Sequence, residues 1–410
     1  MLLLYRKAAA RCALLFVAEE VYHSLKRKGI ALNMRAPEFF DLLIAVLRYN
    51  NKIRLNIAGR INLIMSNDSF LRACRLEKTP YTPVWLMRQA GRYMKEYMAI
   101  RKKRTFLEMC RTPEIATEVT LQPIRKFNLD AAIIFADILL PLEGMGVGLR
   151  FAKDEGPVIK NPVRTTKAID AIRIIEPEED VPYLLKALSM VKSELNSKVP
   201  LLGFSGAPFT IASYIIEGGA SRNYMHTKAM MYNDPGAWKT LMNKISEILI
   251  GYLDAQIRAG ADAVQVFDSW VGCLGPDDYR AFVLPYTKRL ISTIKRRHKK
   301  TPVINFSTNT GSYIEHVGDA GGDVIGVDWR IRLDDAWKRI GYGRAIQGNL
   351  DPTVLFSSPK EIRKRTKGLL EMAGGRPGHI FNLGHGIILG TPVDSVRVLV
   401  DSVHELSGGG

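Results

Sequence analysis

The sequence predicts an α/β fold, a (β/α)8 barrel of the TIM type. Between residue 82 and the C-terminus, eight short apolar segments alternate with longer segments of helical pattern. The apolar segments are almost continuously hydrophobic and rich in β-branched residues, as is typical of parallel strands buried on both faces. Eight such units in one chain indicate a barrel. An open, doubly wound sheet is the alternative, because one sequence does not reveal the order of strands in space.

The eight expected strands are residues 83–87, 131–137, 200–206, 263–268, 302–307, 323–329, 345–349 and 379–385. Helices are expected at 112–127, 177–195, 234–260 and 391–406, and three of these four begin with a Thr-Pro or Asp-Pro pair that favours a helix start. The glycine-rich segment 138–159 is expected to form a hairpin after the second strand.

The chain of 410 residues carries a formal net charge of +17. A nucleic acid, a membrane surface or a polyanionic small molecule could each account for this excess. The basic runs at 101–104 and 295–300 are expected to be solvated faces. Neither run is interleaved with aromatic residues, so no nucleic-acid partner is expected. No segment approaches about 18 consecutive apolar residues, so no membrane span is expected either.

The cysteines are few and widely separated: Cys12, Cys74, Cys110 and Cys273. This spacing argues against a disulfide framework, and no Cys/His cluster suggests a zinc site. We therefore expect no metal and a reducing, cytoplasmic compartment.

Residues 1–64 differ in composition from the rest of the chain, with 11 Lys/Arg against 4 Asp/Glu. Their opening has arginines inside its apolar run, unlike a secretory signal, and it contains Glu19 and Glu20, unlike a typical transit peptide. A mis-called translation start, an organelle address and an accessory helical segment remain open for this extension. The barrel itself is expected to span residues 65–410 as a single domain.

Polar and charged residues stand at or just beyond the ends of the expected strands. In a barrel of this kind, catalytic residues gather at the C-terminal ends of the strands. The residues at these positions are Arg88, Arg92, Asp137, Ser205, Asp268, Ser269, Ser307, Asn309, Asp328, Asn349 and His385.

Arg88 and Arg92 are separated only by small or polar residues, so a turn there would leave both guanidinium groups free to point inward. Arginine captures carboxylate or phosphate through two parallel hydrogen bonds, and a pair suggests a multiply charged anion. Asp137 lies between apolar neighbours, where a carboxylate is costly without a function or a partner. A surface ion pair for the arginines and a helix cap or ion pair for Asp137 are the alternatives.

His385 lies between two glycines beyond the last expected strand, and these glycines would let the backbone approach a ligand closely. Tyr214 is expected on a helix face, where its hydroxyl meets either a ligand or a core partner. Ser269 could donate to a ligand oxygen or cap the next turn. The residues alone therefore indicate a ligand with several carboxylates or phosphates, and they do not say which.

The segment PVWLMRQAGRYMKEY, residues 83–97, resembles the N-terminal signature of the uroporphyrinogen decarboxylase family. The resemblance continues through TPEIATEVTLQPIRKFNLDAAIIFADIL, GFSGAPFTIASYIIEGG, GNLDP and NLGHGIILGTP, and it covers about residues 65–406. It implies a single (β/α)8 domain that works as a homodimer without metal or organic cofactor. The implied reaction is the loss of four CO2 from the acetate arms of uroporphyrinogen III, which gives coproporphyrinogen III.

The resemblance also implies roles for individual residues. The family's catalytic aspartate, a transition-state stabiliser, falls on Asp137, and Arg88 is a candidate for assisting proton delivery. The substrate-binding residues of the family fall on Arg88, Gln89, Ala90, Gly91, Arg92, Asp137, Tyr214, Ser269 and His385.

The sequence departs from the family pattern at a few positions, such as Leu389 where proline is common and Ala136 where serine is common. None of these departures removes a matched ligand residue. The alternatives are a porphyrinogen-binding protein without catalysis and a zinc-dependent corrinoid methyltransferase on the same barrel. The methyltransferase is disfavoured because Cys273 is the only cysteine after residue 110.

Overall fold

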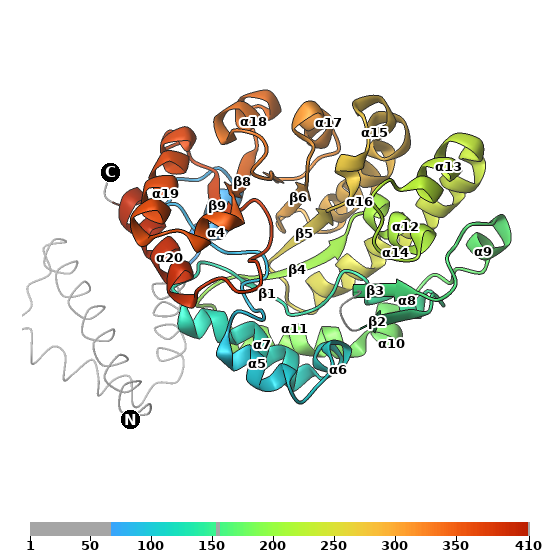
Figure 1. The fold of residues 1–410 in the computed structure, drawn as a ribbon, viewed down its shortest axis with the longest axis horizontal. Coiled ribbons are helices and arrows are strands. Elements are labelled where there is room, and N and C mark those ends of the chain that lie inside the picture. The colour runs from blue at the N-terminus through green and yellow to red at the C-terminus, as the bar shows by residue number, and fades with distance from the viewer. Residues whose placement is uncertain (1–66, 153–155, 409–410) are drawn as a thin grey trace, which may run out of the picture. The chain divides into compact units, whose positions relative to one another are not determined.

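Seven parallel strands form the central sheet of the computed structural model, which describes residues 67–152 and 156–408 (Figure 1). The strands follow chain order in the sheet, β1-β4-β5-β6-β7-β8-β9, and every neighbouring pair is parallel. They are β1 Ala132–Ile133, β4 Leu201–Gly206, β5 Ala263–Asp268, β6 Val303–Ser307, β7 Val324–Gly326, β8 Ala345–Leu350 and β9 His379–Leu383.

The residues before Arg88 join the first strand of the sheet to the last. The Phe381 N–H donates to the Pro83 carbonyl (2.8 Å) and the Trp85 N–H donates to the Phe381 carbonyl (3.4 Å), which makes Val84 a parallel bridge partner of β9. On the other side, the Asp130 N–H donates to the Val84 carbonyl (2.9 Å). The expected α/β barrel is thus confirmed, with a single bridge in place of its first strand.

The expectation of a full strand over 83–87 is wrong. The N–H groups of Leu86 and Met87 donate to side-chain oxygens, those of Gln89 and Asn382 respectively, each at 3.2 Å. Since these two N–H groups are already bonded, they add no further rungs to a ladder with a neighbouring strand.

The second expected strand, 131–137, is shortened to β1 for a related reason. The Ile134 N–H still donates to the Leu202 carbonyl of β4 (3.0 Å), but the next N–H, that of Phe135, donates to the hydroxyl of Thr120 (2.9 Å) and adds no hydrogen bond to the sheet. Beyond this point the chain leaves the sheet and leads to Asp137.

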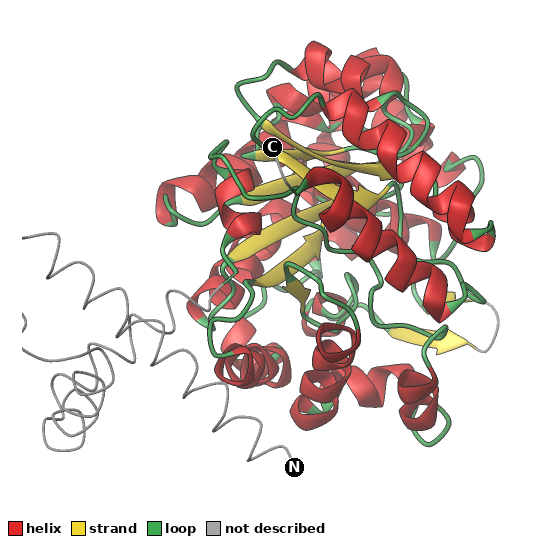
Figure 2. Cartoon of the chain, turned by 90° about the vertical axis from the view of Figure 1, so that its left-hand side faces the viewer, coloured by secondary structure: helices red, strands yellow, loops and turns green. Residues whose placement is uncertain are grey.

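Helices surround the sheet (Figures 1 and 2). Of the expected helices, 112–127 is α7 Pro113–Lys126, 234–260 is α14 Pro235–Arg258 and 391–406 is α20 Val393–Ser407. The helix expected at 177–195 is divided in two at Val181, into α10 Pro177–Asp180 and α11 Pro182–Leu195. The cap of α14 agrees with its Asp-Pro start, because the Asp234 carboxylate accepts from the Ala237 N–H (2.9 Å).

Apart from α16 and α19, the remaining helices are shorter than α7, α11, α14 and α20. They are α4 Ser69–Cys74, α5 Lys95–Arg101, α6 Phe106–Arg111, α8 Pro141–Gly144, α9 Thr166–Asp170, α12 Pro208–Glu217, α13 Met225–Asn233, α15 Pro276–Phe282, α16 Leu284–Arg297, α17 Ile314–Asp319, α18 Leu333–Ile340 and α19 Pro359–Ala373. The expected hairpin is confirmed as the antiparallel pair β2 Leu149–Ala152 and β3 Gly156–Ile159, beside α8 in Figure 1.

The interior of the barrel is apolar and is crossed by one chain of polar contacts. The indole N–H of Trp85 donates to the Gln347 amide oxygen (2.9 Å), and the Gln347 amide donates to the Gln265 oxygen (3.0 Å). The Gln265 amide in turn lies 3.6 Å from the sulfur of Met87. Buried indole and amide groups need such partners, and here they fix Trp85 and Met87, in the segment that leads to Arg88.

Residues 1–64, the expected extension, lie outside the described residues. Residues Asp68–Leu195 and those from Val199 onward form one compact unit. In the part of the chain that the structure describes, no helix is both long and apolar enough to cross a membrane.

Candidate active site

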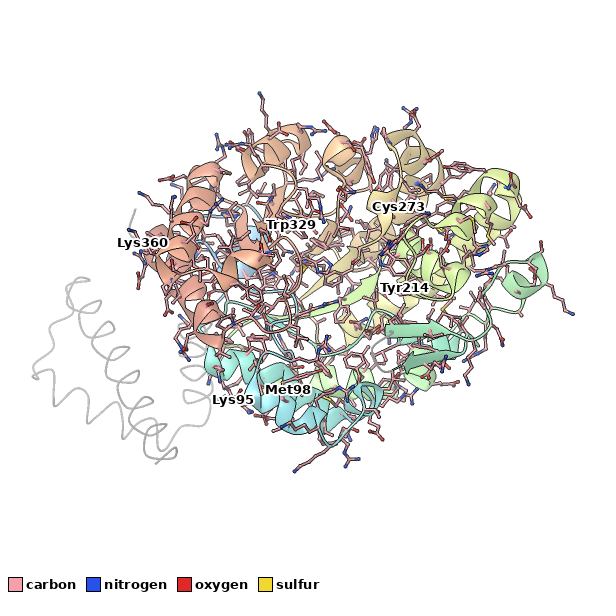
Figure 3. All side chains as sticks on the ribbon, viewed as in Figure 1. Lys95, Met98, Tyr214, Cys273, Trp329 and Lys360 are labelled. Carbon is pink, nitrogen blue, oxygen red and sulfur yellow. The ribbon has the colours of Figure 1, made fainter. Side chains whose placement is uncertain are left out.

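A cavity of about 1420 Å³ lies beyond the C-terminal ends of the strands. The residues that follow β1, β5 and β9 contribute to its wall, as the barrel rule predicts. Figure 3 labels two lining residues from distant elements, Met98 of α5 and Tyr214 of α12. All the residues expected at the site line this one cavity: Arg88, Gln89, Ala90, Gly91, Arg92, Asp137, Tyr214, Ser269 and His385.

Arg88 occupies an unusual backbone conformation, with φ of 60°. Left-handed φ is uncommon for a residue with a long side chain, and it turns the chain sharply away from β9. The Arg88 side chain lies close to Gly386, where a Cβ atom would stand 2.5 Å from the arginine Cδ. The turn and the missing Cβ together define the course of this side chain.

The side chain of Gln89 is engaged within the protein. Its amide oxygen accepts from the Leu86 N–H (3.2 Å) and its amide nitrogen donates to the Ala131 carbonyl (3.2 Å). The side chain is buried, and both of its polar atoms hold the turn that carries Arg88. The Gln89 carbonyl accepts from the hydroxyl of Tyr93 (2.7 Å), which fixes the wall between the two arginines.

Asp137 is half-buried and lines the cavity. One of its carboxylate oxygens accepts from the Leu139 N–H at 2.9 Å. Burial raises the pKa of this carboxyl, while the Leu139 N–H and the positive charge of Arg88 act in the opposite direction. The site thus holds a carboxylate with little solvation in the electrostatic field of an arginine.

Tyr214 is stacked on Trp270, with ring centroids 3.6 Å apart and an interplanar angle of 29°. Burial and the nearby Asp137 raise the pKa of the Tyr214 phenol to about 12. The hydroxyl is therefore protonated at neutral pH and can donate a hydrogen bond into the cavity.

His385 is neutral at physiological pH. Burial, with Arg88 as the next cause, lowers its pKa to about 4. Ser269 is held through its backbone, because its carbonyl accepts from the hydroxyl of Thr308 (2.7 Å). Both residues therefore present hydrogen-bonding groups without adding charge to the cavity wall.

Among the described residues, six cations line the cavity against two carboxylates, Asp137 and Glu143. The cations are Arg88, Arg92, Arg101, Lys102, Arg111 and Arg150. The excess of four positive charges favours a polyanionic ligand.

Four of these cations, Arg101, Lys102, Arg111 and Arg150, were not among the site residues expected from the sequence. Arg101 and Lys102 belong to the run 101–104 that was expected to be a solvated face. Lys102, Lys103 and Arg104 are exposed as expected, Arg101 is half-buried, and Arg101 and Lys102 also line the cavity. The signal for Arg150 was its place in the glycine-rich hairpin, which was recognised as an insertion but not as part of the site.

Aromatic rings from the strands were also missed. Phe204 packs edge-on against Phe267 at 5.5 Å, and Phe267 packs in the same way against Phe306 at 5.7 Å. All three line the cavity, although they belong to segments that the sequence analysis treated only as buried strands. Together these three rings form an apolar part of the cavity wall, in contrast to the part that carries the charged groups. An apolar aromatic wall suits a large ring system.

Several polar residues at strand ends serve the protein itself. The buried Asp268 accepts from the hydroxyl of Thr210 (2.7 Å), and Asp328 accepts from the Asn309 N–H (2.8 Å) and pairs with Arg330. None of these residues lines the described cavity. Within residues 67–152 and 156–408, no three His, Cys, Asp or Glu side chains come together as a metal site.

Comparison with known proteins identifies the family. The model of the family "Uroporphyrinogen decarboxylase (URO-D)" matches residues 65–406. A uroporphyrinogen decarboxylase from Carboxydothermus hydrogenoformans is 62% identical over 341 residues, which are 83% of this chain and 97% of that protein. One from Sorangium cellulosum is 57% identical over 340 residues, with coverage of 83% and 97%.

Among solved structures, a methyltransferase from Methanosarcina mazei has a TM-score of 0.72 at 19% identity and covers 83% of this chain and 98% of its own. At that identity the likeness shows the shared fold alone. The family model matches most of the chain, and the two relatives are 62% and 57% identical to it. The chain therefore belongs to the uroporphyrinogen decarboxylase family.

Proposed function

We propose that this chain removes CO2 from the four acetate side chains of uroporphyrinogen III and releases coproporphyrinogen III, with no cofactor. The observation that carries the proposal is that Asp137, Arg88 and Arg92 all line one cavity. The names of the relatives, at 57% and 62% identity, agree with it.

The charge of the cavity supports this substrate class. Uroporphyrinogen carries eight carboxylates, four on acetate and four on propionate arms. Arg88 and Arg92 bind carboxylates of this ring through bidentate hydrogen bonds. The remaining cations of the wall attract the anion into the cavity and hold its outer arms.

Each decarboxylation needs a place for the electron pair of the breaking carbon–carbon bond. A pyrrole protonated at a ring carbon is an iminium-like electron sink, so the substrate supplies its own. CO2 leaves and the electron pair moves into the ring, which gives an exocyclic methylene. A proton from the medium completes the methyl group, and the ring carbon then loses the proton that it had gained, so each arm takes up one proton in total and releases one CO2. Asp137 accepts hydrogen bonds from the pyrrole N–H groups and stabilises the positive charge as it develops.

The neighbouring groups support this arrangement. The proximity of Arg88 favours the ionised form of Asp137, and Arg88 also helps to deliver the proton. The protonated Tyr214, the neutral His385 and Ser269 orient the carboxylate arms through hydrogen bonds without neutralising the cations.

The test is an anaerobic assay of the full chain with chemically reduced uroporphyrinogen III, with products separated by their number of carboxyl groups. We expect species with seven, six, five and four carboxyl groups in sequence. Asp137→Asn should lower the rate by about 10²-fold or more, as loss of a group that stabilises transition-state charge does. Asp277→Asn is the control, because Asp277 is exposed and pairs only with Arg280 among the described contacts.

The same assay distinguishes the decarboxylase from the alternative, a porphyrinogen-binding protein without catalysis. A wild-type chain that binds uroporphyrinogen III and releases no CO2 is a porphyrinogen-binding protein, and the decarboxylase proposal then fails.

We further propose that the chain acts as a homodimer in the cytoplasm. Light scattering of the purified protein at about twice the 45.9 kDa chain mass would support the dimer, and a single-chain mass would reject it.

A further inference from the structure

The barrel closes through a parallel ladder that is interrupted after two hydrogen bonds. The Phe381 N–H donates to the Pro83 carbonyl and the Trp85 N–H to the Phe381 carbonyl. In a regular parallel ladder, the next two bonds would run from the Leu383 N–H to Trp85 and from the Met87 N–H to Leu383.

One side chain takes both of those N–H groups. The amide oxygen of Asn382 accepts from the Leu383 N–H at 2.8 Å and from the Met87 N–H at 3.2 Å. The Asn382 side chain is thus inserted between the two segments at the point where the ladder stops. Beyond it, the chain separates from β9 and enters the left-handed turn at Arg88.

The other polar atom of Asn382 is not used. Its amide nitrogen is buried and makes no hydrogen bond within the described residues, and the residue as a whole is 0% exposed. A buried amide N–H2 without a partner is unfavourable by about 1–3 kcal/mol. The hydrogen bonds of this side chain are therefore made through its oxygen alone, and among the described contacts the oxygen serves only the backbone on either side of the interruption.

After the turn, the chain is fixed again from the same loop. The Ile387 N–H donates to the Met87 carbonyl at 2.9 Å, and the neighbouring Gly386 leaves room for the Arg88 side chain. Both peptide groups of Met87 are thus held, one by Asn382 and the other by Ile387. Asn382 itself does not line the cavity.

We propose that Asn382 is a positioning residue, which opens the barrel ladder so that Arg88 can project into the cavity. This proposal rests on the proposed function. In its absence, the segment would continue along β9 and Arg88 would lose its place beside Asp137. Asn382 affects the ligand only through Arg88.

A double-mutant cycle tests this route. The measured quantity is the dissociation constant of coproporphyrinogen III for the full chain under anaerobic conditions, because the product binds without turning over. Asn382→Leu removes the acceptor at similar volume. We expect it to weaken binding about tenfold when Arg88 is present and less than about twofold when it is combined with Arg88→Ala.

Asn382→Asp is the conservative variant. It keeps an oxygen that accepts both N–H groups and places a second oxygen where the nitrogen has no partner, and burial at this site favours the uncharged, protonated carboxyl. We therefore expect this variant to bind the product more tightly than Asn382→Leu does. Thermal unfolding of each variant shows whether that variant is folded.

Asn305→Leu is the matched control. Asn305 is a buried asparagine of β6, and its amide donates to the Val317 and Gly321 carbonyls (3.1 and 3.2 Å) away from the cavity. It should lower the unfolding temperature and change binding by the same factor with and without Arg88. Asn382→Leu acting by one factor in both backgrounds would overturn the proposal. Failure of the wild type to release CO2 would instead overturn the decarboxylase function. The double-mutant cycle could still be interpreted in that case, because it measures binding of the product and not turnover.

Discussion

The side chain of Arg88 lies across the backbone of Gly386. A Cβ atom at Gly386 would stand 2.5 Å from the Cδ and 2.6 Å from the Cγ of the arginine. The other glycine beside His385 is also required by the packing of the protein, because a Cβ at Gly384 would stand 2.4 Å from the backbone nitrogen of Trp329. The two glycines were expected to let the backbone approach a ligand. In the structure they admit neighbouring segments of the chain, and Gly386 also lines the cavity.

Gly386→Ala should therefore displace Arg88 without removing it. A shift of about 1 Å in a group that orients the substrate can lower the rate about 10²-fold, and we expect kcat/KM to fall by about 10- to 100-fold. The measurement is steady-state decarboxylation of uroporphyrinogen III by the variant and the wild type.

Gly251→Ala is the control for this substitution. Gly251 lies in α14, and a Cβ there meets nothing within 4 Å. Replacing a helical glycine by alanine should leave activity unchanged and raise stability by about 0.5–1 kcal/mol. Equal activity of both variants would show that Arg88 tolerates a side chain at Gly386.

The sequence predicted the sheet because each strand carries its own signal, a short apolar run next to a helical pattern. It predicted the members of the site because they follow strand ends, where barrel geometry brings them together. A turn between Arg88 and Arg92 was anticipated, but the hydrogen bond from the Met87 N–H to Asn382 that precedes it was not, because Asn382 is distant in sequence. The cation Arg150 was missed for the same reason, because only the folded hairpin brings it to the cavity.

Asp268 gives a pH dependence to stability. It is buried, and burial raises its pKa from 3.8 to about 7 despite the hydroxyl that Thr210 donates to it. The folded chain therefore holds this proton between about pH 4 and 7, where the unfolded chain has lost it. The contribution to stability is present below pH 3.8 and is lost as the pH rises through 7.

Asp268→Asn cannot ionise and should escape this loss. We expect its free energy of unfolding to exceed that of the wild type at pH 8, with a difference that shrinks toward pH 5. Urea unfolding at one-unit steps between these values measures it. The exposed Asp277→Asn variant provides the reference, and a difference for Asp268→Asn that grows toward pH 5 would contradict the assignment.

Trp270 should report ligand binding through its fluorescence. The chain has five tryptophans, and among the described lining residues only Trp270 belongs to the cavity. A ring ligand near Tyr214 would alter the environment of the stacked indole. We expect coproporphyrinogen III to change the emission of the wild type, and Trp270→Phe to remove most of that change.

Trp329→Phe is the matched variant. Trp329 is partly exposed and lies under the guanidinium of Arg330, 4.1 Å from the ring centroid, and it does not line the cavity. This variant should keep the emission change. Loss of the signal in Trp329→Phe and its retention in Trp270→Phe would place the ligand elsewhere.

Arg150 should contribute to substrate capture through charge rather than through a fixed contact. It is exposed on β2 at the cavity wall, so salt screens its field, with a Debye length of about 10 Å at 0.1 M. KM for the octa-anion should rise with ionic strength, and Arg150→Ala should raise KM at low salt by about threefold while leaving kcat unchanged. The slope of log KM against log salt should also be smaller in this variant, since one attracting charge is gone.

Arg397→Ala is the control. It removes an exposed arginine of α20 that pairs with Asp394 and does not line the cavity, so it tests whether net charge alone is responsible. An equal change of slope in both variants would mean that the whole protein, and not the cavity wall, attracts the substrate.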